Sequence, residues 1–463
     1  MLKVLERPSI ILKQISVNYM DTIGDYAADD YANDIGRYPY LQIRNLVIQT
    51  TDTIKIVLYN DQFLPKIEVY FKDPTMKLID PLFPLDDDII SLFIRSSSEL
   101  LMPIRMDFKI TEFNVVKNDE NINYVLTGLL DVNYLYFQLY STYNSTSFDL
   151  LKRMASEAKL GFASNIENTN DLMTWINPAD TNMEFIQHVV KHSYRSDESF
   201  MLSYIDFYYN LNYVDIETAL NEDITGMEGI YWGANFTKVK DETVTPLFLT
   251  DHPDKINSSM YIQKYNLLNS TMKINLDIGY QKYLTYYDKN GNTEYQFLMD
   301  TISTPGANNK NVILKGKIGK NSEIANNSWD GDFMGVIDSD NVHKNYLYAE
   351  MQNNQNLEFL QKVKIKITLG MMNFNLYRFQ KIELRFYKLQ EMSDKKVIAN
   401  INPDTLAKDA TKDYDIDRLN QRLSGEWLIT AINYTFNKIG GFSQEVTLVR
   451  RELGFNENDY NVE

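Results

Sequence analysis

The chain has 463 residues, of which 44% are hydrophobic and 24% are charged, and this composition supplies apolar cores for about three globular domains. Asp and Glu outnumber Lys and Arg by 63 to 46, and the formal net charge of −17 disfavours a protein that grips nucleic-acid phosphates. Cysteine is absent, which excludes disulfide frameworks, thiolate zinc sites and cysteine nucleophiles.

Neither the first residues nor any later window has the apolar run that a membrane segment needs. Glu6 and Arg7 lie where a signal peptide would be apolar, and Asp131 interrupts the most apolar window, residues 124–140. We therefore expect no membrane insertion by this chain.

Alternating apolar and polar residues dominate the first part of the chain and predict an antiparallel β domain over residues 1–143. Its expected strands are residues 53–59, 66–71, 89–95, 105–116 and 122–130. The last two form a hairpin with a polar tip at residues 117–121.

A helical period then predicts a mixed α/β domain over residues 144–225. Its expected elements are helices starting at Ser147 and spanning 182–194, a strand over 200–211 and a short helix over 215–220.

Residues 226–360 give an irregular, β-rich pattern that ends in a predicted helix over 346–360. Strands return in a second β domain over 361–455, for which strands from 200–285 are candidates to complete the sheet, and residues 456–463 form a tail. The predicted fold class is α+β and β-rich. Two similar antiparallel, tube-like β-barrel domains have a mixed α/β domain inserted between them.

An internal repeat supports the idea of two similar domains. Ile54-Lys55-Ile56, Lys66–Phe71 and Ile110–Asn114 are matched in the same order by Val363-Lys364-Ile365, Lys381–Phe386 and Ile429–Asn433. Two barrels per chain would let a trimer present six quasi-equivalent positions on one face and three on the other. An adaptor between a six-fold and a three-fold partner is a mechanical part.

The candidate chemical sites are weak. His188 and His192 lie four residues apart on a predicted helix with Glu184 one turn earlier, but the third zinc ligand is missing and a solvated helix face is the preferred interpretation. Asp86-Asp87-Asp88 is interpreted as a charged turn that enters a strand.

Other residue types that could form a site also lack a recognised arrangement. Asp251 and His252 belong to no nucleophile motif, and no phosphate-binding loop occurs. A cluster of aromatic residues is interpreted as strand core plus interface; it comprises Tyr204, Phe207, Tyr208, Tyr209 and Tyr213. We predict no catalytic, cofactor-binding or metal-binding residues and no enzyme. The alternative from another class, a carbohydrate-active enzyme, needs a pair of carboxylates that does not stand out.

Three stretches resemble the baseplate hub proteins of contractile-tailed bacteriophages, especially the T-even type. These stretches are 57–71 with 84–88, 173–178 with segments of 185–211, and 423–429 with 441–451. The resemblance implies a homotrimeric, pseudo-six-fold ring that joins the hexameric tail tube to the trimeric central spike and forms part of the DNA ejection channel. It implies a structural protein with no cofactor, located in the tail baseplate of a virion assembled in the host cytoplasm.

The same resemblance implies a set of partners. They are the central spike protein, the tail tube or tube-initiator protein, baseplate wedge proteins and the tape measure protein, with DNA only in transit. The alternative within this class is the hub ring of a type VI secretion system or a phage-derived contractile injection particle. The excess of acidic residues further predicts a neutral or acidic channel that does not hold DNA.

Overall fold

We analysed a computed structural model of the chain. It describes residues 2–10, 39–44, 46–48, 53–72, 83, 85, 87–94, 104–118, 121–197, 199–222, 230–232, 262–270, 273, 281–290, 293–300, 317–319, 333–338, 340–369, 376–386, 423–437 and 441–451. Within these ranges, no helix is long and apolar enough to cross a membrane.

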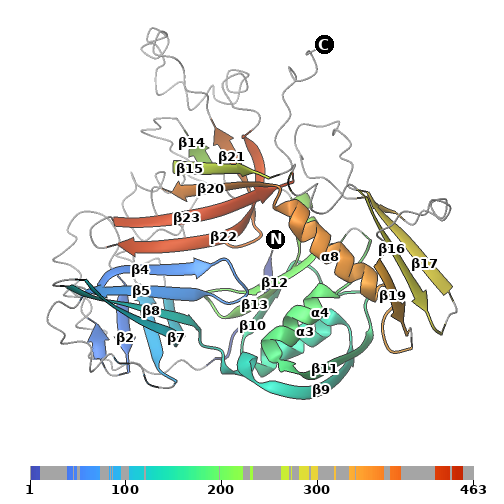
Figure 1. The fold of residues 1–463 in the computed structure, drawn as a ribbon, viewed down its shortest axis with the longest axis horizontal. Helices are drawn as coiled ribbons and strands as arrows, with labels where there is room; N and C mark the ends of the chain where they lie inside the picture. Colours follow the sequence, from blue (N-terminus) through green and yellow to red (C-terminus); the bar gives the residue numbers. More distant parts are fainter. Residues whose placement is uncertain are drawn as a thin grey trace, which may run out of the picture.

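A large, mostly antiparallel β-sheet forms one side of the molecule and joins 13 of the described strands (Figure 1). Its hydrogen-bonded order is β15-β20-β23-β22-β4-β5-β8-β7-β6-β2-β3, and β21 and β14 continue from β22. The strands are β2 (Tyr40–Ile43), β3 (Leu46–Ile48), β4 (Thr53–Asn60), β5 (Lys66–Lys72), β6 (Ile89–Ile94), β7 (Ile104–Asn118), β8 (Asn121–Leu130), β14 (Ile230–Trp232), β15 (Ile262–Asn269), β20 (Val363–Leu369), β21 (Lys381–Phe386), β22 (Gly425–Asn437) and β23 (Gly441–Arg450). The expected β-rich class with large antiparallel sheets is confirmed.

Two groups of five strands in this sheet follow the same plan. The first β unit consists of β4 to β8, and the second β unit consists of β15 and β20 to β23. The first unit has the spatial order β4-β5-β8-β7-β6, and the second has the order β15-β20-β23-β22, followed by β21. Strands that hold the same place in chain order therefore hold the same place in the sheet.

The residue register of the two units also agrees. The pairing of β4 with β5 shifts between Thr53 and Lys55, and the pairing of β15 with β20 shifts between Ile262 and Lys264. A β-bulge is a specific local feature that adds one residue to a strand, so its recurrence at the same place is evidence that the units are equivalent.

This register corrects the repeat as aligned from the sequence. Ile110 and Ile429 do lie on equivalent strands, β7 and β22. However, β20 corresponds to β5 rather than β4, and β21 corresponds to β6 rather than β5. Alternation of apolar and polar residues shows which side chains of a strand face the core, but the pattern is the same in every half-buried strand. Aligning similar patterns therefore paired strands that are not equivalent.

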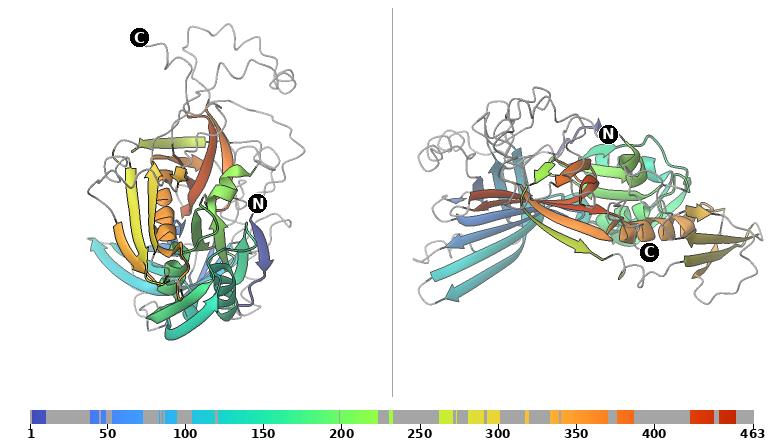
Figure 2. Two further views of the ribbon diagram at one scale, coloured as in Figure 1. Left: turned by 90° about the vertical axis from the view of Figure 1, so that its right-hand side faces the viewer. Right: turned by 90° about the horizontal axis from the view of Figure 1, so that it is seen from above.

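The units differ in what joins their first two strands. A short turn over residues 61–65 connects β4 to β5, whereas residues 270–362 connect β15 to β20. The long connection contains the helix α8 (Tyr346–Leu360) and a four-stranded sheet in the order β18-β17-β16-β19, at the far end of the molecule from the large sheet (Figures 1 and 2). The strands of this sheet are β16 (Gln281–Asp288), β17 (Thr293–Asp300), β18 (Lys317–Gly319) and β19 (Phe333–Ile337).

Between the β units in the chain lies the middle unit, a small α/β assembly. Its sheet has the order β1-β10-β13-β12, so β1, from the start of the chain, pairs here rather than with the large sheet. A separate ribbon pairs β9 with β11. The elements are β1 (Lys3–Glu6), η1 (Asn133–Tyr136), β9 (Gln138–Ser145), α3 (Ser147–Glu157), β10 (Gly161–Ser164), β11 (Met173–Thr181), α4 (Asn182–Lys191), β12 (Met201–Ile205), β13 (Asn210–Asp215) and α5 (Ile216–Asn221).

Local sequence explains where the two longer helices of the middle unit begin. The Thr146 hydroxyl accepts a hydrogen bond from the Asp149 amide at the start of α3, and Thr181 and Glu184 form a capping box at the start of α4. Both helices were expected. The expected single strand over 200–211 is wrong, because residues 206–209 form a turn between β12 and β13.

Candidate functional site

A similar turn precedes both β6 and β21. Asp87 and Phe379 have left-handed φ angles of 64° and 63°. In the first turn the Asp88 carboxylate accepts the Leu85 amide at 2.5 Å. In the second turn, the Gln380 side chain accepts the amide of Tyr377 at 3.2 Å. The same hydrogen-bond pattern therefore shapes two turns of unrelated composition.

Each turn is tied to a bulge on the neighbouring long strand. The amides of Ile110 and Ile429 donate to the carbonyls of Asp88 and Gln380, each at 3.0 Å. The following residue bulges out of register in both strands, between Ile110 and Glu112 and between Ile429 and Ala431.

The bulged residue is threonine in both units. The Thr111 hydroxyl donates to the Thr127 carbonyl at 3.2 Å, and the Thr430 hydroxyl donates to the Thr447 carbonyl at 3.3 Å.

The predicted charged turn at Asp86-Asp87-Asp88 is described in part. Asp87 and Asp88 lie in a turn that enters β6, as expected, and Asp86 lies outside the described residues.

The two β units meet edge to edge within the chain. Residues 432–437 of β22 extend past β21 and pair antiparallel with β4, with Asn433 opposite Tyr59 and Tyr434 opposite Leu58. We call this contact the internal junction. It makes one continuous sheet from two quasi-equivalent units.

Arg378 connects the internal junction to the middle unit. Its buried guanidinium donates to the carbonyls of Gln62, Asp61 and Thr430, the last at 2.8 Å. It also lies 4.7 Å from the ring centre of Tyr204 on β12, whose hydroxyl donates back to the Arg378 carbonyl at 3.1 Å. Burial lowers the pKa of Arg378 to about 10, so the group remains charged at neutral pH.

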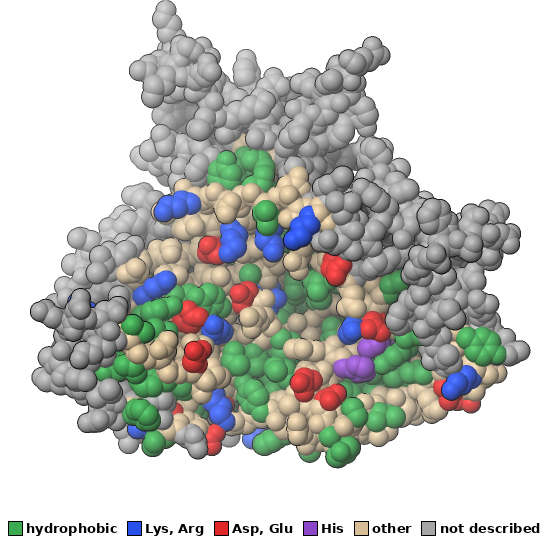
Figure 3. Space-filling model, viewed as in Figure 1, with side chains coloured by type: hydrophobic (Ala, Val, Ile, Leu, Met, Phe, Trp, Pro, Cys, Tyr) green, Lys and Arg blue, Asp and Glu red, His purple; other side chains and the backbone are tan. Residues whose placement is uncertain are grey.

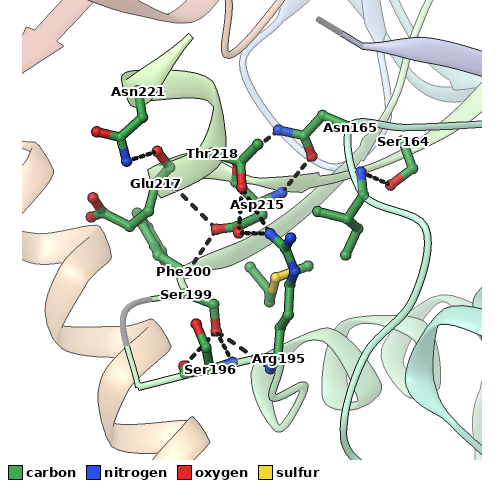
Figure 4. Close-up of polar contacts among 12 residues, drawn as sticks. Ser164, Asn165, Arg195, Ser196, Ser199, Phe200, Asp215, Glu217, Thr218 and Asn221 are labelled. Atoms are coloured by element: carbon green, nitrogen blue, oxygen red, sulfur yellow. Dashed lines mark hydrogen bonds and ion pairs between the residues drawn. The ribbon is translucent and has the colours of Figure 1, made fainter.

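A buried carboxylate organises the end of the middle unit that faces α8 (Figure 4). Asp215 caps α5 and accepts hydrogen bonds from the amides of Phe200 and Glu217, from the Thr218 hydroxyl and from the Arg195 guanidinium, the last at 2.7 Å. Because four donors surround this carboxylate, it acts as a structural acceptor and has little capacity left as a general base.

The same end of the middle unit contacts the second β unit. Arg451, at the end of β23, is buried and donates to Glu217 on α5 and to Asn356 on α8, the latter at 3.2 Å. An apolar cluster accompanies these contacts and includes Phe200, Leu360 and Leu428. α8 is therefore fixed to both units.

The pair His188 and His192 lies at the contact of α4 with α8. His192 is only 5% exposed, stacks on Tyr346 with ring centres 4.0 Å apart, and contacts the Glu350 carboxylate at 3.2 Å. The His188 ring contacts the Tyr346 hydroxyl at 3.0 Å. The expectation of a solvated helix face is wrong for His192, because a partner helix 158 residues further along the chain covers it.

Electrostatics in this contact favour a neutral His188 beside a charged Glu350. Burial, together with the nearby His192 and Lys191, lowers the pKa of His188 to about 4. The hydrogen bond from His192 and the 2.6 Å ion pair with Lys191 lower the pKa of Glu350 to about 2. Among the described residues, no group of three His, Asp or Glu side chains is arranged to hold a metal ion.

The aromatic residues singled out from the sequence lie on β12, in the turn after it and on β13. Tyr204, Phe207, Tyr209 and Tyr213 are buried, whereas Tyr208 is 48% exposed. Their contacts are structural. The Tyr209 hydroxyl accepts a hydrogen bond from the Asp107 amide at 2.8 Å, and the ring centres of Phe207 and Tyr434 lie 5.9 Å apart. Asp251 and His252 lie outside the described residues.

The sequence did not single out Arg378 or Arg451. Each is one arginine among many, and only the register of distant strands brings it against its partners. Figure 3 shows acidic and basic side chains of the described residues interspersed on the visible face. The contacts described above join sheets and helices within the chain.

The fold has counterparts among solved structures. A 43 kDa tail protein of prophage MuSo2 from Shewanella oneidensis has a TM-score of 0.50 and 11% identity, over 89% of this chain and 98% of that one. A tail protein of Neisseria meningitidis has a TM-score of 0.48 and 10% identity, over 89% and 96% of the chains. An Escherichia coli component of the type VI secretion system has a TM-score of 0.40 and 10% identity, over 90% and 77%.

No model of a known protein family matches the chain, and no curated protein matches it. Of these structures, one is a tail protein of a prophage, one is a tail protein and one is a component of the type VI secretion system. The chain has the fold of the MuSo2 tail protein, as the resemblance to tail hub proteins predicted.

Proposed function

We propose that the chain is a structural, non-catalytic hub of a phage tail. Three copies would form a pseudo-six-fold ring that joins the hexameric tail tube to the trimeric central spike and surrounds part of the DNA ejection channel. The observation that carries this proposal is the repetition of a five-stranded unit, in the same register, within one chain. Such a repeat lets three chains contribute six similar positions.

In this proposal each β unit is a tube-like barrel, and the boundaries expected from the sequence define the parts. The barrels lie in 1–143 and 361–455, the α/β domain in 144–225, the insertion in 226–360 and the tail in 456–463. The pairing of β14 and β15 with β21 and β20 supports the contribution of strands from 200–285 to the second barrel.

The partners in this proposal are the central spike protein, the tail tube or tube-initiator protein, wedge proteins and the tape measure protein, at the baseplate of the virion. The same ring would also serve a type VI secretion system or a phage-derived injection particle. Capsid and terminase genes beside the gene for this chain would assign it to a phage.

Light scattering of the protein purified together with its spike or tube partner tests the stoichiometry. We expect a ring with three times the 54.1 kDa mass of the chain, whether or not the isolated subunit is monomeric. A complex with two or six copies would overturn the proposed adaptor.

A further inference from the structure

The internal junction has a counterpart that is incomplete within one chain. In the second β unit, residues 425–428 of β22 pair with β21 and residues 432–437 pair with β4. In the first unit, residues 104–109 of the equivalent strand β7 pair with β6. Residues 112–118 of β7 continue past β6 and, in the described part of the chain, pair with β8 alone.

The strand that would complete this contact is β15, the equivalent of β4. Whereas β4 lies between β5 and β22, β15 pairs with β20 and ends the strand order of the described sheet. Both segments expose apolar side chains: Val115 is 41% exposed, Val116 39% and Leu268 56%. Strand edges with exposed apolar residues are prone to pair with another chain.

We propose that residues 113–118 of β7 in one copy pair antiparallel with β15 of the next copy and so repeat the internal junction between chains. This inference rests on the proposed ring and names the contact that closes it. Transferring the register of the internal junction places Asn114 opposite Leu268, as Asn433 lies opposite Tyr59. It likewise places Val115 opposite Leu267, as Tyr434 lies opposite Leu58.

Such a contact is head-to-tail, because one edge of the first unit meets a different edge of the second. Head-to-tail contacts close into a ring when the rotations of successive contacts add up to a full turn. The internal junction within a chain and the proposed contact between chains join equivalent strands in the same register. The resulting sheet would continue around the ring with its backbone donors and acceptors paired.

Disulfide trapping tests this register directly, because the chain contains no cysteine. Opposite residues of an antiparallel pair alternate between closer and wider spacing, so two adjacent pairs sample both. The variants are therefore N114C/L268C and V115C/L267C. Six strands separate β7 from β15 in the sheet, so a bond between these positions joins two chains.

We expect mild oxidation of the assembled protein to give covalent dimers and trimers, which a reductant should convert back to single chains by cleaving the disulfide bonds. A mixture of the single variants N114C and L268C should link, whereas N114C alone should not, because the contact joins unlike edges. The displaced pair N114C/K264C is the matched control and should stay unlinked, since Lys264 lies four residues from Leu268 along β15. The internal pair N433C/Y59C should close within one chain and show that the geometry permits the bond.

The possible results separate the two proposals. A trimer by light scattering without bonds in either designed pair, or with equal bonding in N114C/K264C, would overturn the pairing of β7 with β15 and leave the ring intact. A chain that is monomeric both alone and with its tail partners would overturn the ring and the pairing together. The single variants alter exposed positions, so mixing them provides the test even if a double variant folds poorly.

Discussion

Arg378 contacts three parts of the molecule that are far apart in the sequence. Its guanidinium donates to carbonyls in the turn between β4 and β5 and to Thr430 on β22, and it packs on Tyr204 of the middle unit. A buried carbonyl that loses its donor costs about 1–3 kcal/mol, so a residue that serves several carbonyls has a large effect on stability.

We expect Arg378→Met to lower the free energy of unfolding by about 2–4 kcal/mol in urea denaturation, because methionine keeps the apolar stem and removes every donor. The matched control is Arg153→Met. Arg153 is exposed and pairs with Glu157 one turn away on α3, so its loss should leave the free energy of unfolding close to that of the wild type. Equal stability of the two variants would contradict the structural role of Arg378.

At the scale of elements, the packing of α4 on α8 joins the middle unit to the long connection of the second β unit. Polar side chains make this contact: Asn353 on α8 donates to the carbonyls of Lys191 and Ser193, each at 3.0 Å, and so caps the end of α4. The histidine cluster lies beside this cap. The contact is therefore sensitive to protonation in a way that an apolar interface would not be.

We expect the free energy of unfolding to fall as the pH is lowered from about 6.5 to about 4, in part because of His188. The unfolded chain binds a proton at His188 in this range while the folded chain keeps the ring neutral, so acid favours unfolding. His188→Gln should reduce this loss by about 1 kcal/mol, a modest value because the ring is partly exposed. Urea denaturation at pH 7 and pH 4.5 measures the change.

Gln187→Ala, on the exposed neighbouring position of α4, is the control for this experiment and should keep the pH dependence of the wild type. An identical pH dependence in His188→Gln would show that His188 is not responsible. Glu350 adds a second loss at lower pH, since its folded pKa of about 2 is below that of an ordinary glutamate and its stabilisation disappears as the pH falls below about 4.5.

For the molecule as a whole, the distribution of charge bears on the proposed channel. Two lysines of the large sheet pair with glutamates: Lys66 lies 2.7 Å from Glu68, and Lys366 lies 3.2 Å from Glu445. A lysine that is paired with a carboxylate attracts phosphate less than a free one, because the local charge is neutralised. A channel wall lined by such pairs would attract DNA weakly.

We expect the assembled ring to bind double-stranded DNA weakly even at low salt, where electrostatic attraction is strongest. Fluorescence anisotropy with labelled DNA at about 50 mM salt measures this affinity. A strongly positive inner wall of the ring, or tight binding that weakens steeply with salt, would contradict the expectation of a neutral or acidic channel.

The sequence alone determined the local elements of this protein. Alternation identified the strands of the first β unit, and the helical period identified α3 and α4, because these signals depend on neighbours within a few residues. It also identified the repeat and one of its equivalent pairs, Ile110 and Ile429.

Only the tertiary structure decided which strands correspond, which edges meet and which polar residues matter. Alternating strands are alike in pattern, so β20 could be assigned to β5 only from its hydrogen-bonded neighbours. Arg378, Arg451 and His192 acquire their roles from partners between 52 and 317 residues away. Their roles depend on distance in space, which a pattern read along the chain does not contain.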